Sequence, residues 1–285
     1  MKTKRGFTIV ELLTVLVIIS ILMGLLLPAI KMVRNMAKET KARAQMSALS
    51  MGITAFRNDY GDYPPSEWNP INDVGYCGAQ KLAEALLGLD LMGFHPNSAW
   101  RSDGDQGTNP IYDSTDENNL KQRRERYIEL EGANVYRLKE IFNDTDDLAN
   151  TFVICDPFGV RNNTDNPKAG KIGTPILYYK ANPSSKSVST TYGVTERIYN
   201  AEDNLSLVLL NRVTPTGDPG GKHQSNGNLF LDESNSNYTY FYESYIRDPK
   251  VSTVNWPYRP DSYLLISAGL DGIYGTNDDI TNFGN

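Results

Sequence analysis

The sequence predicts an α+β protein in which one long N-terminal helix packs against the antiparallel β-sheet of a globular head. An almost uncharged apolar run covers Phe7–Ile30, and an apolar stripe with helical spacing follows over residues 42–60. Short segments rich in β-branched and aromatic residues occupy the second half of the chain. The length of 285 residues is sufficient for an anchor and a sizeable head.

The apolar run predicts a helix that spans a membrane. It holds 24 residues and a single charge, Glu11. As a helix it would be about 36 Å long, which exceeds the hydrocarbon core of ~30 Å. A cleavable secretory signal would have a shorter apolar core followed by a small-residue cleavage site. Here the run continues without a break into a helical pattern, so we expect the segment to be retained.

Charge is distributed unevenly along the chain. Residues 1–43 carry eight basic and two acidic residues, a net charge of +6, whereas residues 44–285 carry −12. An acidic head argues against a nucleic-acid partner and suits divalent cations. Basic residues flank the apolar run on both sides, so charge alone leaves the orientation in the membrane undecided. They are Lys2, Lys4 and Arg5 before it, and Lys31, Arg34, Lys38, Lys41 and Arg43 after it.

The helix is expected to continue to Tyr60 and to stop at Gly61 and Pro64-Pro65. Its apolar stripe should lie on the head, because such stripes are usually core rather than cofactor sites. The stripe consists of Ala42, Met46, Leu49, Ile53, Phe56 and Tyr60, with Lys41, Arg43, Gln45, Ser50 and Arg57 lying off it. Pro28 ends the apolar run and predicts a kink, with or without a role in assembly.

The remaining elements are predicted from local composition. We expect a helix over 79–94, a loop over Ser98–Asn119 and a charged amphipathic helix over Leu120–Phe142. The segment Thr214–Asn228 predicts an exposed connection. The predicted strands are Thr151–Cys155, Pro175–Ala181, Leu205–Val213, Tyr238–Ile246 and Ser262–Ser267.

Two groups of residues suggest possible sites in the head. Cys77 and Cys155 would form a disulfide if the head is exported, or remain as two buried thiols. Near the C-terminus, three glycines allow a tight loop that carries hard oxygen ligands of the kind Ca²⁺ prefers. The glycines are Gly269, Gly272 and Gly275, and the oxygen-bearing residues are Asp271, Asn277, Asp278 and Asp279.

The string Lys4-Arg5-Gly6-Phe7-Thr8-Ile9-Val10-Glu11-Leu12-Leu13 resembles the processing site of type IV prepilins and pseudopilins. The resemblance implies that a prepilin peptidase cleaves after Gly6 and methylates the new N-terminus of Phe7. It also implies a leader on the cytoplasmic side and a head on the other. The implied organisation is a leader (1–6), a transmembrane and filament-core helix (7–30), an amphipathic helix half (31–60) and a head (61–285) with an insert at about 66–150.

Glu11 is expected to take part in assembly. A carboxylate at the centre of a bilayer costs roughly 2.5–3.5 kcal/mol and somewhat less near the interface. Cleavage at Gly6 would create an ammonium group at Phe7, and the resemblance implies that Glu11 pairs with this amine on its own subunit or on a neighbour. Such a pair would set the register between subunits. The alternative is a charge that extends to the membrane interface with no assembly role.

Further segments resemble the major pseudopilins of type II secretion systems. These are residues 55–64, which end in Tyr63-Pro64, the turn Asp156-Pro157-Phe158-Gly159, and the C-terminal loop. The likeness of that loop to a pseudopilin calcium loop implies Asp271, Asp278 and Asp279 as ligands, with the Ser267 carbonyl as a further candidate. Asn277 stands where an acid is common. The alternative is a solvated acidic turn.

The resulting hypothesis is a structural subunit, not an enzyme, of a type II secretion pseudopilus. The implied partners are copies of itself, minor pseudopilins, the prepilin peptidase and the inner-membrane assembly platform, with the head in the periplasm. The alternatives are a major or minor pilin of a surface type IV pilus, and an anchored sugar-binding or hydrolytic ectodomain. Catalytic motifs are not supported, because the sequence has only His95 and His223, and Gly217–His223 lacks the spacing of a phosphate-binding loop.

Overall fold

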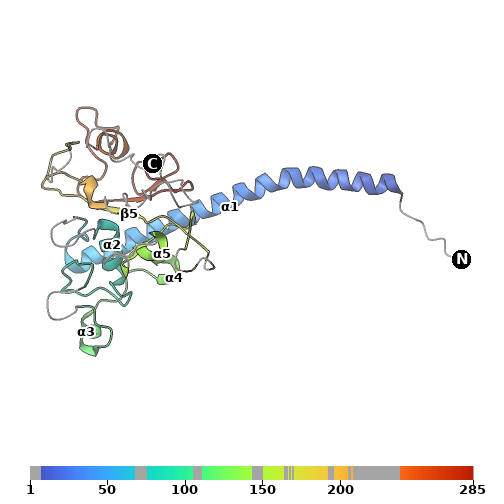
Figure 1. Ribbon diagram of the computed structural model, residues 1–285. Coiled ribbons are helices and arrows are strands. Elements are labelled where there is room, and N and C mark those ends of the chain that lie inside the picture. Colours follow the sequence, from blue (N-terminus) through green and yellow to red (C-terminus); the bar gives the residue numbers. More distant parts are fainter. Residues whose placement is uncertain are drawn as a thin grey trace.

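The computed structural model describes residues 8–67, 76–104, 111–142, 150–163, 166, 168, 170–191, 196–204, 207 and 238–284. One long helix, α1 (Ile9–Tyr60), enters a globular head with its C-terminal part and leaves its N-terminal part projecting away (Figure 1). Antiparallel sheets and short helices form the head. The predicted α+β class is therefore confirmed.

Helix α1 runs without interruption through 52 residues. It ends where the sequence predicts, because Gly61 takes a left-handed conformation (φ 82°) and its N–H bonds to the Arg57 carbonyl at 2.7 Å. Pro28 lies inside the helix, and the ribbon curves gently along its length rather than breaking (Figure 1). One continuous helix therefore connects the N-terminal end of the chain to the head.

The main sheet has three antiparallel strands, β5 (Leu177–Lys180), β6 (Tyr263–Ser267) and β7 (Ile280–Thr281), in the order β5-β6-β7. Two of these match the strands predicted over 175–181 and 262–267. Two smaller antiparallel pairs join β1 (Val135–Arg137) to β2 (Phe152–Ile154) and β3 (Arg161–Asn162) to β4 (Lys171–Ile172). Strand β2 confirms the prediction for 151–155.

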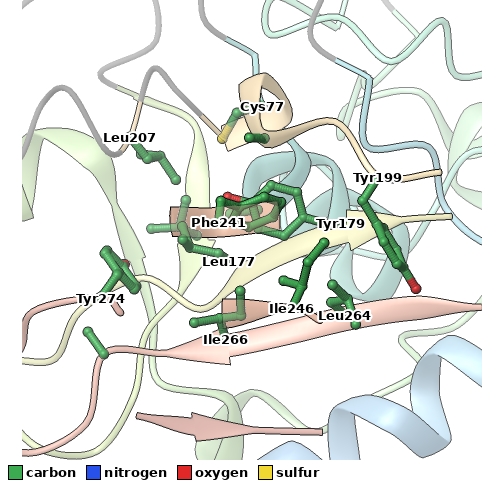
Figure 2. Packing of buried hydrophobic residues seen from close by; sticks show 14 of the residues in the cluster. Cys77, Leu177, Tyr179, Tyr199, Leu207, Phe241, Ile246, Leu264, Ile266 and Tyr274 are labelled. Carbon is green, nitrogen blue, oxygen red and sulfur yellow. The ribbon is translucent and has the colours of Figure 1, made fainter. Parts of the chain in front are cut away.

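Both faces of the main sheet are buried, and alternate residues divide between two apolar clusters. Tyr178 and Leu265 face α1, and they pack with the apolar stripe of that helix. Leu177 and Ile266 point the other way into a second cluster, which Figure 2 shows on the side of β5 and β6 away from α1. The predicted packing of the helix stripe on the sheet is confirmed, and the sheet is the middle layer of the head.

Gln45 corrects one detail of the predicted stripe. The spacing placed it off the apolar face, yet it is buried, and its Nε2 donates to the carbonyls of Ala133 and Cys155 at 2.9 Å each. These carbonyls belong to the ends of the β1–β2 unit. A polar side chain is tolerated there because it satisfies two backbone acceptors that the helix would otherwise cover.

The insert packs on the C-terminal end of α1. Helix α2 (Gly78–Leu87) begins as predicted but ends seven residues before the predicted Phe94. Gly88 has a φ of 86°, and a Cβ there would lie 2.1 Å from the Gly93 carbonyl oxygen, so the chain turns sharply. Phe94 then packs edge-on against Phe56 of α1, with ring centroids 5.1 Å apart. The apolar residues after Leu87 therefore form a turn rather than another helical turn.

The prediction of one helix over Leu120–Phe142 is wrong. This segment contains the end of α3 (Glu117–Gln122), α4 (Leu130–Ala133), β1 and α5 (Leu138–Phe142). Helix α3 ends at Arg123, where the backbone becomes extended (ψ 149°), and the Arg123 side chain contacts Asn119 and the carboxylate of Asp90. Asn134, with a φ of 49°, ends α4 and directs the chain into β1. Tertiary contacts thus override the charged helical pattern.

The strand predicted over Tyr238–Ile246 is also wrong, because Phe241–Tyr245 forms a π-helical turn, η4. Tyr238, Phe241 and Tyr242 are buried while residues 239 and 240 are exposed, a spacing that fits a helix. The short 3₁₀ helix η3 spans Ala201–Asn204. Apart from the buried Leu207, the predicted strand 205–213 and connection 214–228 lie outside the described residues.

Candidate assembly and membrane-anchoring site

The N-terminal part of α1 presents apolar side chains on all sides. Ile9 is 83% exposed, and Leu25 and Leu27 are each 70% exposed. No residue in the most apolar stretch of α1 is buried by the rest of the described chain. In the described part of the chain, α1 is the one helix long and apolar enough to cross a membrane. Exposed apolar surface on this scale requires a cover of lipid or of other helices.

Glu11 lies in the first turn of α1, within a capping box with Thr8. The backbone N–H and the hydroxyl of Thr8 donate to Glu11 Oε2 at 2.8 and 2.7 Å. In return, the Glu11 N–H donates to the Thr8 hydroxyl oxygen at 3.2 Å. This arrangement satisfies donors that the start of a helix leaves unpaired. The carboxylate is therefore engaged by its own chain in the single subunit.

Sequence reasoning missed this capping box, although Thr8-Ile9-Val10-Glu11 has the T-x-x-E spacing that signals one. It assigned Glu11 a partner from the amine at Phe7. The predicted processing residues Gly6 and Phe7 lie outside the described residues, so the pairing with that amine stays a prediction. The observed geometry adds a second partner for the same carboxylate.

The C-terminal loop after β6 places Asp271 against Asp278 and directs Asp279 toward Tyr245. Asp278 Oδ2 accepts the Asp271 N–H at 2.9 Å, and Asp279 Oδ2 accepts the Gly275 N–H at 2.7 Å and the hydroxyl of Tyr245. Gly269 makes this closure possible, because its φ is 64° and a Cβ would lie 2.2 Å from the Asp278 carbonyl oxygen.

The oxygen-rich donor set of this loop fits the chemistry of Ca²⁺. The carboxylate oxygens bond to backbone N–H and hydroxyl groups, and within the described ranges no three His, Cys, Asp or Glu side chains form a metal-binding group. Asn277 is exposed and Ser267 is buried. Burial raises the pKa of Asp279 to about 7, and burial, with the nearby Asp278, raises the pKa of Asp271. Calcium binding therefore stays a prediction.

The two cysteines are both buried and belong to the apolar cluster on the far side of the sheet. Both lie in the described part of the chain, and no disulfide joins them there. The Cys155 carbonyl accepts a hydrogen bond from Gln45, and the Cys77 N–H donates to Gln80 Oε1 at 2.8 Å. Both side chains therefore belong to the core of the head, and the choice between a disulfide and two thiols stays a prediction.

Asp156 is a buried acid that sequence analysis named only as part of a turn. Its carboxylate accepts hydrogen bonds from the Phe158 N–H and the Ser267 hydroxyl, at 3.1 Å each, and from the Thr174 hydroxyl. These residues come from three separate segments around the sheet. Burial raises its pKa to about 6. With its oxygens all engaged by the fold, Asp156 holds the head together rather than presenting a reactive group.

Comparison with known protein families identifies the N-terminal segment of the chain. A family model described as the prokaryotic N-terminal methylation motif matches residues 1–27. Searches of the curated proteins and of the solved structures found no match. The match includes the start of α1 and the residues around Gly6, Phe7 and Glu11. It supports a type IV pilin-like protein, anchored in a membrane and processed at its N-terminus.

Proposed function

We propose that this chain is a structural subunit of a type II secretion pseudopilus. Subunits would polymerise through the N-terminal part of α1 into a filament that helps to move proteins across the outer membrane. The observation that carries the proposal is a single uninterrupted helix whose N-terminal part is apolar and uncovered while its C-terminal part is fixed in a folded head. Such a helix holds a head at a constant distance from a membrane or filament core.

We infer that processing and assembly use the first turn of this helix. Cleavage after Gly6 and methylation of Phe7 would leave the Thr8 N–H intact, so the capping box would survive maturation. The amine of Phe7 on a neighbouring subunit would then compete with Thr8 for the Glu11 carboxylate. An ammonium–carboxylate contact is stronger than a neutral one, particularly where water is excluded.

The proposed location is the inner membrane, crossed once, with the head in the periplasm. Partners would be further copies of the chain, minor pseudopilins, the prepilin peptidase and the inner-membrane assembly platform. The enzyme activity needed for transport would reside in those other components. The resemblance of the N-terminus to prepilin processing sites supports a cytoplasmic leader, and the acidic head supports a partner that is neither nucleic acid nor an anionic surface.

We further propose that the C-terminal loop binds Ca²⁺ through Asp271, Asp278 and Asp279, with Asn277 and the Ser267 carbonyl as further candidates. The support is the oxygen-rich donor set and its likeness to the pseudopilin loop. Binding would stabilise the head, so the melting temperature of the protein should rise in excess Ca²⁺ relative to chelator. D278N should reduce that rise. No difference between Ca²⁺ and chelator would remove the metal from this proposal and leave the filament role standing.

Mass spectrometry of the native product tests processing directly. The expected N-terminus is Phe7 carrying one methyl group, and an intact leader would contradict the proposal. A deletion strain then tests the secretion role: it should retain exoproteins in the periplasm and still display surface pili. Loss of surface filaments with normal secretion would instead support the second candidate, a subunit of a surface type IV pilus. The methylation motif is compatible with both a pseudopilus subunit and a surface-pilus subunit. The Tyr63-Pro64 turn and the C-terminal loop favour the pseudopilus.

A further inference from the structure

A cavity opens between the underside of the head and the part of α1 that leaves it. Its volume is about 620 Å³. Pro28, Lys31, Met32 and Glu39 of α1 form one wall, and Leu270 and Asp278 of the C-terminal loop belong to the other. Apolar, cationic and acidic side chains thus surround one space. This mixture is unlike the uniformly apolar surface of the helix below it.

The position of the cavity places it at a membrane surface. Residues 9–30 form about 33 Å of helix, which fills a hydrocarbon core of ~30 Å. Pro28 therefore lies at the end of that core and Lys31 lies just beyond it. The headgroup layer on each side is about 5–7 Å thick. The lower end of the cavity is then at the level of the lipid phosphates, and this placement rests on the membrane anchoring proposed above.

The face of α1 that packs on the head changes character at this level. Residues 31, 35 and 38 precede Ala42 at spacings of four, three and four, so they continue the buried stripe towards the membrane. Above Ala42 the stripe is apolar, and below it the stripe is Lys31, Asn35 and Lys38. Cationic residues therefore replace apolar ones on the same face where head contact gives way to the headgroup layer.

The two lysines on this face have different surroundings. Lys38 donates from Nζ to the Phe158 carbonyl at 2.6 Å and so belongs to the head. Lys31 lies about 10 Å nearer the membrane. Among the described residues no hydrogen bond or ion pair engages the Lys31 ammonium, which lines the cavity. A long basic side chain at a membrane interface commonly contacts lipid phosphate.

We propose that this cavity binds the phosphoethanolamine headgroup of a phospholipid in the leaflet on the head side. The phosphate would contact Lys31, and the ammonium would contact the half-exposed carboxylate of Glu39, which also pairs with Arg43 in the same cavity lining. Met32 and Leu270, which are 66% and 41% exposed, would cover the glycerol region. A headgroup carrying both charges matches a cavity carrying both, whereas a purely anionic headgroup would bring its charge close to the acids of the lining, Glu39, Asp278 and Asp279.

Native mass spectrometry of the full-length chain tests this. The chain would be released from nanodiscs that contain equal amounts of phosphatidylethanolamine, phosphatidylcholine and phosphatidylglycerol. We expect preferential retention of phosphatidylethanolamine, and about fivefold less retention for K31Q, which removes one cationic contact near the phosphates. K41Q is the matched control, because Lys41 is exposed about 15 Å further from the core and is absent from the cavity lining. Its retention should equal that of the unmodified chain.

A second variant separates the two halves of the headgroup. E39Q should keep the phosphate contact and reduce the preference for phosphatidylethanolamine over phosphatidylcholine, whose trimethylammonium cannot donate hydrogen bonds. Equal retention of the three lipids, or equal retention by K31Q and K41Q, would overturn the headgroup site. Failure of the chain to enter nanodiscs would overturn both this site and the proposed anchoring, whereas normal insertion without lipid preference would overturn the site alone.

Discussion

The two parts of α1 carry similar apolar side chains and have opposite surroundings. Ile53, in the C-terminal part, is 0% exposed beneath the sheet and α2, whereas Ile18, in the N-terminal part, is 56% exposed. The C-terminal part alternates apolar with polar residues, so a single face is buried. The N-terminal part is apolar all round, so no single globular partner could cover it. The apolar surface of one helix is therefore covered in two ways: the head buries its C-terminal part, and lipid or other helices must cover its N-terminal part.

The largest effect is expected from Glu11→Ala, which tests the external cover. The substitution should leave membrane insertion intact, because it removes a charge from an apolar segment, and should abolish filament assembly. Thr8→Ala is the matched control: it disrupts the capping box but keeps the carboxylate, and should cost only about 1 kcal/mol of helix stability. The measurement is the yield of sheared or cross-linked filaments beside the amount of protein in the membrane fraction.

Normal filament yield from the Glu11→Ala variant would contradict an assembly role for this acid. Equal loss of filaments in the two variants would show that helix capping is what assembly needs. Either result would revise the role of the N-terminal part of α1 in assembly. Neither would affect the packing of its C-terminal part against the head.

The next prediction compares the same substitution, isoleucine to alanine, in the two parts of α1. Ile53→Ala should lower the free energy of unfolding of the head by about 2–5 kcal/mol, because it leaves a cavity in a buried cluster. Ile18→Ala should leave the head's melting temperature unchanged and should weaken assembly. Thermal unfolding in detergent micelles, followed by near-ultraviolet circular dichroism, measures the first quantity. Similar shifts in melting temperature for both variants would remove the distinction between the two parts of the helix.

A smaller effect concerns the polar contacts beneath the C-terminal part of α1, where Asp156 follows the Cys155 carbonyl that Gln45 binds. Burial raises the pKa of Asp156 to about 6, above its ordinary value of 3.8. The native state then binds the proton more tightly than the unfolded state. The contribution of Asp156 to the free energy of unfolding should therefore fall by about 3 kcal/mol between about pH 4 and pH 6.

Asp156→Asn should remove this contribution, because the amide can donate to the hydroxyls of Thr174 and Ser267 and its oxygen can accept from Phe158. Urea unfolding at pH 4 and pH 7 provides the measurement. The variant should gain stability relative to the unmodified chain as the pH rises. A difference in unfolding free energy that does not depend on pH would show that Asp156 has an ordinary pKa in the folded protein.

The smallest effect is expected at the surface of α1, between its two parts. Glu39 and Arg43 form an ion pair of 2.9 Å in which both side chains are about half exposed. Solvent screens such a pair, so Glu39→Gln should change the free energy of unfolding by less than about 0.5 kcal/mol. Thermal unfolding at low and high salt measures it. A loss comparable to that of Ile53→Ala would mean that charge, rather than apolar burial, joins the helix to the head.

The sequence predicted α1 and the strands that pack on it because both have strong local patterns. The stripe from Ala42 to Tyr60 repeats with helical spacing, and Gly61 supplies its stop. The segments 120–142 and 238–246 failed because their patterns were decided by distant contacts. Arg123 bonds to Asp90, more than thirty residues away in sequence, and composition alone cannot reveal such a partner.

The candidate site divides in the same way. Glu11 was identified because one charge in an apolar run is visible in any sequence, whereas its partner Thr8 was overlooked beside it. The tight loop at the C-terminus was expected because Gly269, Gly272 and Gly275 allow one, and all three have positive φ, whereas the metal-binding role of its aspartates stays a prediction. The role of Asp156 could not be predicted, because Thr174 and Ser267 reach it only after the sheet has formed.

The capping box bears on how subunits wait before they polymerise. In a single subunit the Glu11 carboxylate is already hydrogen-bonded to Thr8. A monomer in the bilayer would therefore not need a neighbouring subunit to satisfy this acid. Under the proposed function, recruitment would exchange the neutral Thr8 contact of Glu11 for the stronger charged contact with the amine of a neighbouring subunit. A filament built by such exchanges would draw on monomers that are already folded in the bilayer, with no covalent change beyond maturation.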